Sequence, residues 1–284
     1  VNIIANYVFI FGKFGAPRME IAGAALGTLM ARAAEFLVTF GYIFFKDKSL
    51  GLRIKHLLHM PGKEFFSNYL RLGLPVLVSD GLLGLGGNIV SIILGHMGAA
   101  VVAANAICQV IDRLFTVVIQ GISNASSIVT GHTLGEGSHE KAMQQGYTFY
   151  VLSIFFGLIA AVMVLACGPL TIAMYSLNAE TIRITEEMMI AYAVIVFFQC
   201  IQSVMTKGVL RGGGDTKFLM KADILFMWLV SIPLGGIGGL ILGWPAWSTI
   251  LALRIDYVIK SVWCISRLKS GKWIHTADGI VERD

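Results

Sequence analysis

The chain has 284 residues, of which 56% are hydrophobic and only 14% are charged, and its mean hydropathy is +0.75. Soluble domains carry about 25% charged residues, so this composition excludes an ordinary soluble domain and indicates an integral membrane protein. The formal net charge of +5 is explained by cationic loops on one side of a membrane, without nucleic acid as a partner.

The first residues predict the end of one membrane span over 1–12 and a second span over 21–45. The chain opens on an apolar stretch at Val1, without a charged segment and a cleavage site after it, so we expect no signal peptide. We expect it instead to be the C-terminal portion of a longer protein.

A polar connection over 46–66 separates these spans from the rest of the chain. It is rich in Lys, Arg and His, and it predicts a boundary between two units, with a helix at the membrane surface near 50–60. We interpret this segment as a linker between two lobes.

Six apolar segments follow, separated by turn-forming residues. They lie near 67–95, 99–130, 147–167, 188–207, 222–243 and 247–266, and each is long enough to span most of a bilayer as a helix. The predicted fold is therefore an all-α polytopic transmembrane helix bundle. Residues 67–268 would form a six-helix unit and 269–284 a polar tail.

Loop charge predicts the orientation of these spans. When alternate loops are assigned to one side, the side that contains 46–66 receives 14 of the 22 Lys and Arg residues and the other side receives 3. Cytoplasmic loops carry an excess of Lys and Arg, so the linker and the C-terminus are predicted to be cytoplasmic, at the cell membrane.

The span over 69–94 contains Pro75, which should bend the helix, and Asp80, a carboxylate that hydrocarbon does not tolerate. Small and polar residues lie at helical spacing from Asp80, namely Gly84, Gly87, Asn88 and Ser91. One interpretation is an ion or substrate site on a helix that lines a cavity. The other is a paired Asp within a close helix contact.

The span over 99–130 carries the longest polar stripe in the chain. Its members follow a spacing of three to four residues: Asn105, Gln109, Asp112, Thr116, Gln120, Ser123, Asn124 and Ser127. Lipid does not accept such a stripe, so it should line a cavity or meet a partner helix. Asp112 and Arg113 are adjacent, so they should point apart and each needs its own partner.

Later spans carry weaker signals. The span over 188–207 contributes a shorter polar stripe with Gln199 and Gln202, and Pro233 predicts a second hinge besides Pro75. We interpret Asp223 as an interfacial charge beside basic residues. Asp256 and Lys260 are four residues apart and predict an ion pair with a structural role.

Neither a metal site nor a catalytic site is visible in the sequence. The four cysteines are isolated, and the two-His zinc motif and the nucleophilic Ser motif of hydrolases are absent. We predict that the protein is not an enzyme and has no cofactor apart from a coupling ion.

Several short motifs, in this order, resemble those of multidrug and toxic compound extrusion (MATE) transporters. They are Gly73-Leu74-Pro75 in the bent span, Ala103-Ala104-Asn105 at the start of the next, the turn over 131–137 with Lys141-Ala142, and the turn over 210–217. In the first turn His132 stands where the family usually has Asn. The start, with Asn6-Tyr7 and Gly23-Ala24-Ala25, resembles the end of the family's first lobe.

The resemblance implies twelve helices in two six-helix lobes around a central cavity, and export of organic cations driven by Na⁺ or H⁺. The chain would hold the last two helices of the first lobe (1–45), the linker (46–66) and the second six-helix lobe. Its partner would be the missing N-terminal lobe of the same polypeptide. Some branches carry a coupling acid in the bent helix at the position of Leu83.

The leading hypothesis is a secondary antiporter for small substrates. Its cation or substrate site would consist of Asp80, Asn105, Gln109 and Asp112, in a cavity lined by Asn88, Ser91, Thr116, Gln199 and Gln202. One alternative is a two-lobe flippase for lipid-linked carriers, which should line its cavity with several Arg or Lys. Another is a membrane scaffold, which needs no wet cavity.

Overall fold

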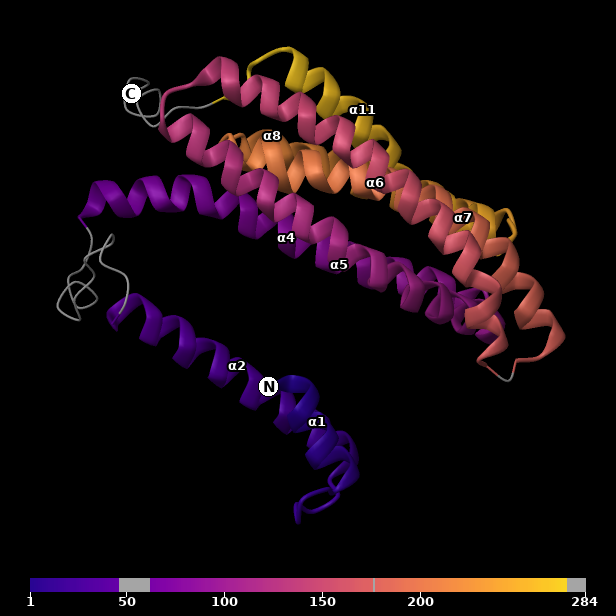
Figure 1. The fold of residues 1–284 in the computed structure, drawn as a ribbon. Coiled ribbons are helices and arrows are strands. Elements are labelled where there is room, and N and C mark those ends of the chain that lie inside the picture. The colour runs from indigo at the N-terminus through magenta and orange to yellow at the C-terminus, as the bar shows by residue number, and fades with distance from the viewer. Residues whose placement is uncertain (46–61, 176, 275–284) are drawn as a thin grey trace. The chain divides into compact units, whose positions relative to one another are not determined.

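The computed structural model describes residues 1–45, 62–175 and 177–274, and within these ranges the regular elements are helices (Figure 1). The chain divides into two compact units, Val1–Phe66 and Ser67–Asp284. The surface helix predicted near 50–60 lies outside the described residues.

The first unit contains α1 (Asn2–Phe11) and α2 (Glu20–Phe45). Helix α1 ends at Gly12, whose φ of 64° is in the left-handed region that glycine adopts without strain. Gly23 allows α2 to approach α1 closely, since a Cβ atom there would lie 2.6 Å from the carbonyl oxygen of Phe9. Helix α2 has 26 residues, about 39 Å of helix, and can therefore cross a membrane.

The second unit contains the six predicted helical segments. Their bounds are α4 (Lys63–His96), α5 (Ala99–Gly135), α6 (His139–Ala173), α7 (Ala179–Ser203) with η1 (Val204–Leu210), α8 (Thr216–Asp223) with η2 (Ile224–Ser231), α9 (Ile232–Gly236) and η3 (Ile237–Ile241), and finally α10 (Ala246–Leu253) with α11 (Ile255–Lys269). Several are longer than predicted, because polar residues continue the helices beyond the apolar stretches.

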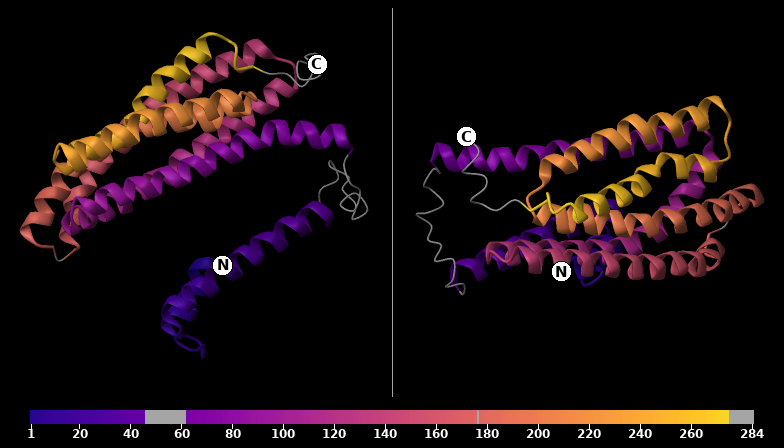
Figure 2. Two further views of the ribbon diagram at one scale, coloured as in Figure 1. Left: turned by 180° about the vertical axis from the view of Figure 1, so that it is seen from behind. Right: turned by 90° about the horizontal axis from the view of Figure 1, so that it is seen from above.

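Helix α7 lies at the centre of the second unit. It contacts α5, α6, α10 and α11. Of the most apolar 18-residue stretch in α7 and η1, 72% is buried. The views in Figure 2 show the long helices of this unit running side by side as a bundle. A central helix surrounded by others can therefore present its polar residues to a shared interior without meeting lipid.

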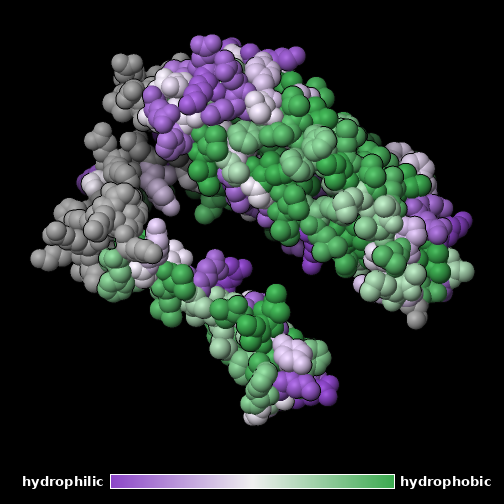
Figure 3. Space-filling model, viewed as in Figure 1, coloured by the Kyte–Doolittle hydropathy of each residue, from purple (hydrophilic) through white to green (hydrophobic). Residues whose placement is uncertain are grey.

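The outer surface of the second unit is apolar. On α6, Phe155, Leu158 and Val162 are 57%, 53% and 64% exposed. Figure 3 shows a hydrophobic band across this unit, with hydrophilic patches towards its ends. Within the described residues, six helices are long and apolar enough to cross a membrane, namely α2 of the first unit and five of the second unit. The exposed apolar band is the surface that lipid would cover, as the composition predicts.

The last predicted span, 247–266, is not one continuous helix. Helix α10 ends at Leu253, Arg254 leaves helical geometry with φ −120° and ψ 12°, and α11 begins at Ile255. Neither glycine nor proline stands at this point, so the local sequence does not predict the break. The break instead accompanies a contact of the Arg254 side chain with Tyr257.

Three segments, η1, η2 and η3, have π-helical geometry. Segment η1 continues the helix of α7. Segments η2 and η3 lie on either side of α9, which contains Pro233, the second predicted hinge. Proline lacks an N–H group, and π-helical turns shift the residues around them and frequently mark functional positions. Pro75 lies inside α4, which continues through it as a helix.

The described part of the predicted tail packs against the bundle. Trp273 is fully buried, and a Cβ atom at Gly213 would lie 2.3 Å from its ring. The absence of a side chain at Gly213 thus leaves room for the indole ring of Trp273. Residues 269–274 therefore belong to the folded unit, whereas 275–284 lie outside the described residues.

Candidate functional site

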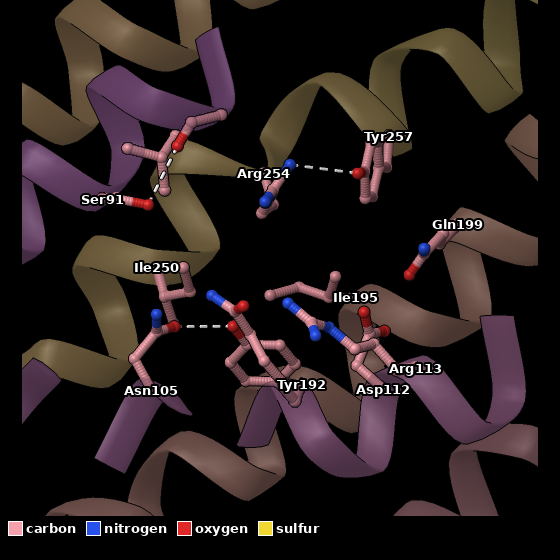
Figure 4. A pocket seen from close by; sticks show the side chains of 13 residues that line it. Ser91, Asn105, Asp112, Arg113, Tyr192, Ile195, Gln199, Ile250, Arg254 and Tyr257 are labelled. Atoms are coloured by element: carbon pink, nitrogen blue, oxygen red, sulfur yellow. Dashed lines mark hydrogen bonds between the residues drawn. The ribbon is translucent and has the colours of Figure 1, made fainter. Parts of the chain in front are cut away.

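A polar pocket of about 220 Å³ lies inside the second unit, between α4, α5, α7, α10 and α11 (Figure 4). Its lining residues are Gly87, Val90, Ser91, Asn105, Gln109, Asp112, Arg113, Tyr192, Ile195, Gln199, Ile250, Arg254 and Tyr257. Three of the four predicted binding residues are among them, namely Asn105, Gln109 and Asp112.

Two helices supply most of the polar lining, and in each the spacing follows the helical repeat. Helix α5 presents Asn105, Gln109 and Asp112, and α7 presents Tyr192 and Gln199. Residues three, four or seven apart lie on one face of a helix, so each stripe faces the pocket over about two turns. The predicted stripe of α5 thus lines a cavity over this part of its length.

Hydrogen bonds join these two stripes. The Tyr192 hydroxyl donates to Asn105 Oδ1 at 2.7 Å, and both side chains are buried. Gln199 Nε2 donates to Thr116 Oγ1 at 3.4 Å, which connects Thr116 to the pocket lining. Neutral amide and hydroxyl groups that satisfy one another fix the wall of the pocket without placing a charge in the membrane.

Asp112 differs from its neighbours because part of its carboxylate is unpaired. Its Oδ1 atom is buried and has no hydrogen-bond partner among the described residues. A buried polar atom without a partner is costly, so an occupant that donates a hydrogen bond or carries positive charge would lower that cost. This oxygen is the strongest candidate in the pocket for direct contact with a ligand.

Two arginines in the pocket were missed by the sequence analysis. Arg254 Nη1 donates to the Tyr257 hydroxyl at 3.1 Å, and its guanidinium lies 5.5 Å from the centre of that ring. Arg113 also lines the pocket, although we expected it to point away from Asp112. A basic residue inside an apolar span is the signal that could have identified Arg254.

Of the other predicted site residues, some line the pocket and others lie outside it. Ser91 lines the pocket and donates to the carbonyl oxygen of Gly87 at 3.1 Å, whereas Asn88 is exposed. Asp80 lies outside the pocket lining, with a half-exposed side chain bonded to Arg211 at 3.1 Å. Gln202 lines a smaller cavity and donates to Thr206 at 3.0 Å.

A second polar cluster lies outside the pocket. Asp223, which we interpreted as an interfacial charge beside basic residues, is only 7% exposed and is bonded to Lys260, so it is a buried, paired group and not a solvated charge. The predicted pair of Lys260 with Asp256 is confirmed at 3.0 Å. The described ranges hold no group of three or more His, Cys, Asp or Glu residues that could bind a metal ion.

Thiol labelling tests whether the pocket is wet. We expect a cysteine at position 109 to react with a membrane-impermeant thiol reagent, because Gln109 lines the cavity. Its neighbour Cys108 is 1% exposed and serves as the unreactive control, in a background where the partly exposed Cys167 is replaced by Ser. Equal protection of positions 108 and 109 would contradict an aqueous cavity and favour a scaffold.

A bundle of membrane-length helices around a polar pocket is the architecture of a multi-pass membrane transporter. The family model described as MatE matches residues 75–237, and the chain belongs to the MATE family. This is a family of multi-pass transporters associated with multidrug resistance, not of enzymes.

Relatives agree with this assignment. The chain is 28% identical over 240 residues to the multidrug resistance protein MdtK of Photorhabdus laumondii, covering 84% of the chain and 52% of that protein. Its fold matches a crystal structure of a MATE mutant with a TM-score of 0.81 at 17% identity. It also matches a MOP superfamily transporter of Pyrococcus furiosus, described with a binding pocket of reverse polarity, with a TM-score of 0.79 at 20% identity.

The chain is shorter than these proteins. Each structural match covers 95% of the chain and 60% of the other protein, so the chain spans about half to three fifths of the length of its relatives.

Proposed function

We propose that the chain forms the second lobe and the end of the first lobe of a secondary antiporter that exports small, organic, drug-like molecules. The observation that carries this proposal is the buried polar pocket between spans, with an unpaired oxygen of Asp112 in its wall. An intramembrane acid that faces a cavity is by default a candidate functional group.

The proposed mechanism is competition for a carboxylate. A carboxylate that holds a coupling cation cannot also neutralise a substrate, so entry of the ion on one side favours release of the substrate there. Asn105 and Gln109 would orient the substrate beside Asp112. The helix segments at Pro75 and Pro233 would act as hinges during alternating access.

Membership of the family supports the proposal that another lobe contributes to this site. The relatives extend well beyond the matched region, and transporters of repeated build place the substrate between their two halves. We therefore expect a first lobe of the same polypeptide to complete the cavity. Loop charge favours a cytoplasmic linker and a cytoplasmic C-terminus.

Charge in the pocket bears on the class of substrate. Asp112 favours an organic cation, as the family resemblance implies. Arg113 and Arg254 in the same lining favour a second candidate, a substrate that also carries a carboxylate or phosphate, because guanidinium groups bind such anions well. A zwitterion would satisfy both charges, and the lipid-linked flippase alternative depends on the same arginines.

Transport by the complete polypeptide in liposomes tests the proposed function. We expect an imposed H⁺ or Na⁺ gradient to drive accumulation of a fluorescent organic cation, and collapse of that gradient with an ionophore to abolish it. Movement of a purely anionic substrate instead would favour the second candidate. Failure of every substrate class to move under either gradient would contradict antiport.

A further inference from the structure

A cluster of buried charges joins three spans away from the substrate pocket. Lys260 of α11 is fully buried and lies 2.8 Å from Asp223 Oδ1 and 3.0 Å from Asp256 Oδ2. The Ser79 hydroxyl of α4 donates to Asp223 Oδ2, and the Ser231 hydroxyl donates to Asp256 Oδ1 at 3.4 Å. The backbone N–H of Asp256 donates to Ser231 Oγ at 2.9 Å.

With all three ionisable groups charged, this cluster carries a net charge of −1, since two carboxylates share one ammonium. Uncompensated charge is expensive in a buried site within a membrane protein. One added positive charge would make the cluster neutral. These three groups together have the charge of a site for one monovalent cation, since the nearby Arg211 is paired with Asp80 and the nearby Lys207 is exposed. The proposed function assigns no role to this part of the lobe.

The geometry of the cluster favours binding of a proton over binding of Na⁺. The Lys260 ammonium already occupies the position between the two carboxylates at hydrogen-bond distance, and a bound Na⁺ would have to displace it. A proton needs no space of its own. A hydroxyl both donates and accepts, so Ser79 can donate to the ionised Asp223 and accept from the protonated acid.

A small cavity beside Asp223 has room for about one water. It measures about 10 Å³, roughly the volume one water needs, and is lined by Leu83, Gln202, Thr206, Lys207, Arg211, Leu219 and Asp223. Arg211 Nε is a buried donor without a partner among the described residues, so it can bind an occupant of this cavity. The other end of Arg211 holds the half-exposed Asp80.

Asp256 has no comparable access. Its side chain is 2% exposed, against 10% for Asp223, and it does not line the cavity. The charged and titratable groups that face Asp223 are Lys260, Asp256 and Cys264 from α11, Lys207 and Arg211 from the end of the α7 span, and Asp80 through Arg211. Asp223 is therefore the acid that can exchange a proton with water.

We propose that Asp223, held by Ser79 and Lys260, is a proton-binding site separate from the substrate pocket, and that it couples H⁺ entry to transport. This inference rests on the proposed antiport. A proton delivered by water adds to one carboxylate oxygen of Asp223, and the charge of the cluster changes from −1 to 0. Deprotonation of Asp223 later in the transport cycle returns the proton to water.

The cluster is mechanically connected to the substrate pocket through two helices. On α11, Tyr257 lines the pocket one turn before Lys260 of the cluster. On α4, Ser79 bonds to Asp223, and Gly87 and Ser91 of the same helix line the pocket. A change in the bonds of Asp223 therefore acts directly on two walls of the pocket.

The test compares the complete transporter with its Asp223→Asn variant in liposomes, in which substrate flux and internal pH are measured together. Asn mimics the protonated, neutral cluster. We expect the variant to keep downhill substrate flux and to lose accumulation driven by a pH gradient, together with the accompanying H⁺ movement. Full H⁺-driven accumulation in Asp223→Asn would overturn the inference.

Asp215→Asn is the matched control. Asp215 is 4% exposed and is bonded to Arg267 at 2.7 Å, so the same substitution also breaks a largely buried ion pair of this lobe. We expect this control to retain H⁺-driven accumulation. Equal loss of coupling in both variants would show a general effect of a broken pair and overturn the assignment to Asp223.

A spectroscopic readout keeps the inference testable if Asp223→Asn does not fold. In pH-difference infrared spectra, we expect the wild-type transporter to gain a protonated-carboxyl band whose frequency shifts in Ser79→Ala, because that carboxyl loses its hydroxyl partner. A band that Ser79→Ala leaves unchanged overturns the inference. Na⁺-driven transport without H⁺ movement overturns it and leaves antiport intact, whereas absence of all transport contradicts the proposed function.

Discussion

Asp112→Asn should weaken binding of an organic cation by about 10- to 100-fold, the equivalent of the roughly 1.5–3 kcal/mol that a hydrogen bond to a charged group contributes. The substitution keeps the shape of the side chain and removes the charge from the pocket. The unpaired Oδ1 atom is what makes the effect large, because no described residue donates a hydrogen bond to it in place of a ligand. Equilibrium binding of a fluorescent cation to the purified transporter measures the change.

The charge of the substrate provides an internal control for this prediction. A neutral analogue of the same cation should bind wild type and Asp112→Asn alike, since it makes no ionic contact with the carboxylate. Asp215→Asn should leave both affinities unchanged, because Asp215 lies outside the pocket and is bonded to Arg267. An equal loss for the cation and its neutral analogue would indicate that Asp112 shapes the pocket and does not bind the charge.

Lys260→Ala should destabilise the protein by about 3–5 kcal/mol, the usual cost of removing one partner from a buried ion pair. Lys260 is fully buried and holds two carboxylates, so its loss leaves Asp223 and Asp256 without their shared counter-charge. We expect the thermal unfolding midpoint of the purified protein in detergent to fall by about 10 °C, given the roughly 2–4 °C per kcal/mol of large domains.

Two further variants separate this charge effect from lost packing. Lys269→Ala removes an exposed lysine from the last turn of the same helix and should leave the midpoint nearly unchanged. Adding Asp223→Asn and Asp256→Asn to Lys260→Met removes all three charges and should restore most of the lost stability, since neutral replacement of a buried ionic cluster is often well tolerated. If the triple variant were as unstable as Lys260→Ala, buried charge would not be the cause.

Much of the architecture followed from the sequence because lipid imposes a simple rule. A span needs about 20 apolar residues and must satisfy its backbone internally, so the apolar segments between 67 and 266 could be identified as helices in order. The polar stripe of α5 was also recognisable, because lipid does not accept a row of amide and carboxyl groups. Asn105, Gln109 and Asp112 could therefore be selected as pocket residues before the fold was known.

Contacts between distant segments were beyond the reach of those rules. Ser79 and Asp223 are 144 positions apart, and Lys217 and Lys221 near Asp223 in the sequence made a surface position the natural interpretation. The break at Arg254 has no glycine or proline to signal it in the sequence. Asp80 and Asp112 are both acids in apolar spans, yet one pairs with Arg211 outside the pocket and the other faces into it.

The sequence by itself determined that this protein is a membrane helix bundle with polar faces, because the free energy of placing each residue in lipid depends mainly on its own chemistry. The tertiary structure alone decided which polar faces meet and which acid keeps an unpaired oxygen. It also decided that two acids and a lysine from separate positions share one buried cluster. Such pairings depend on how the helices pack against one another, and helix packing is a property of the whole lobe.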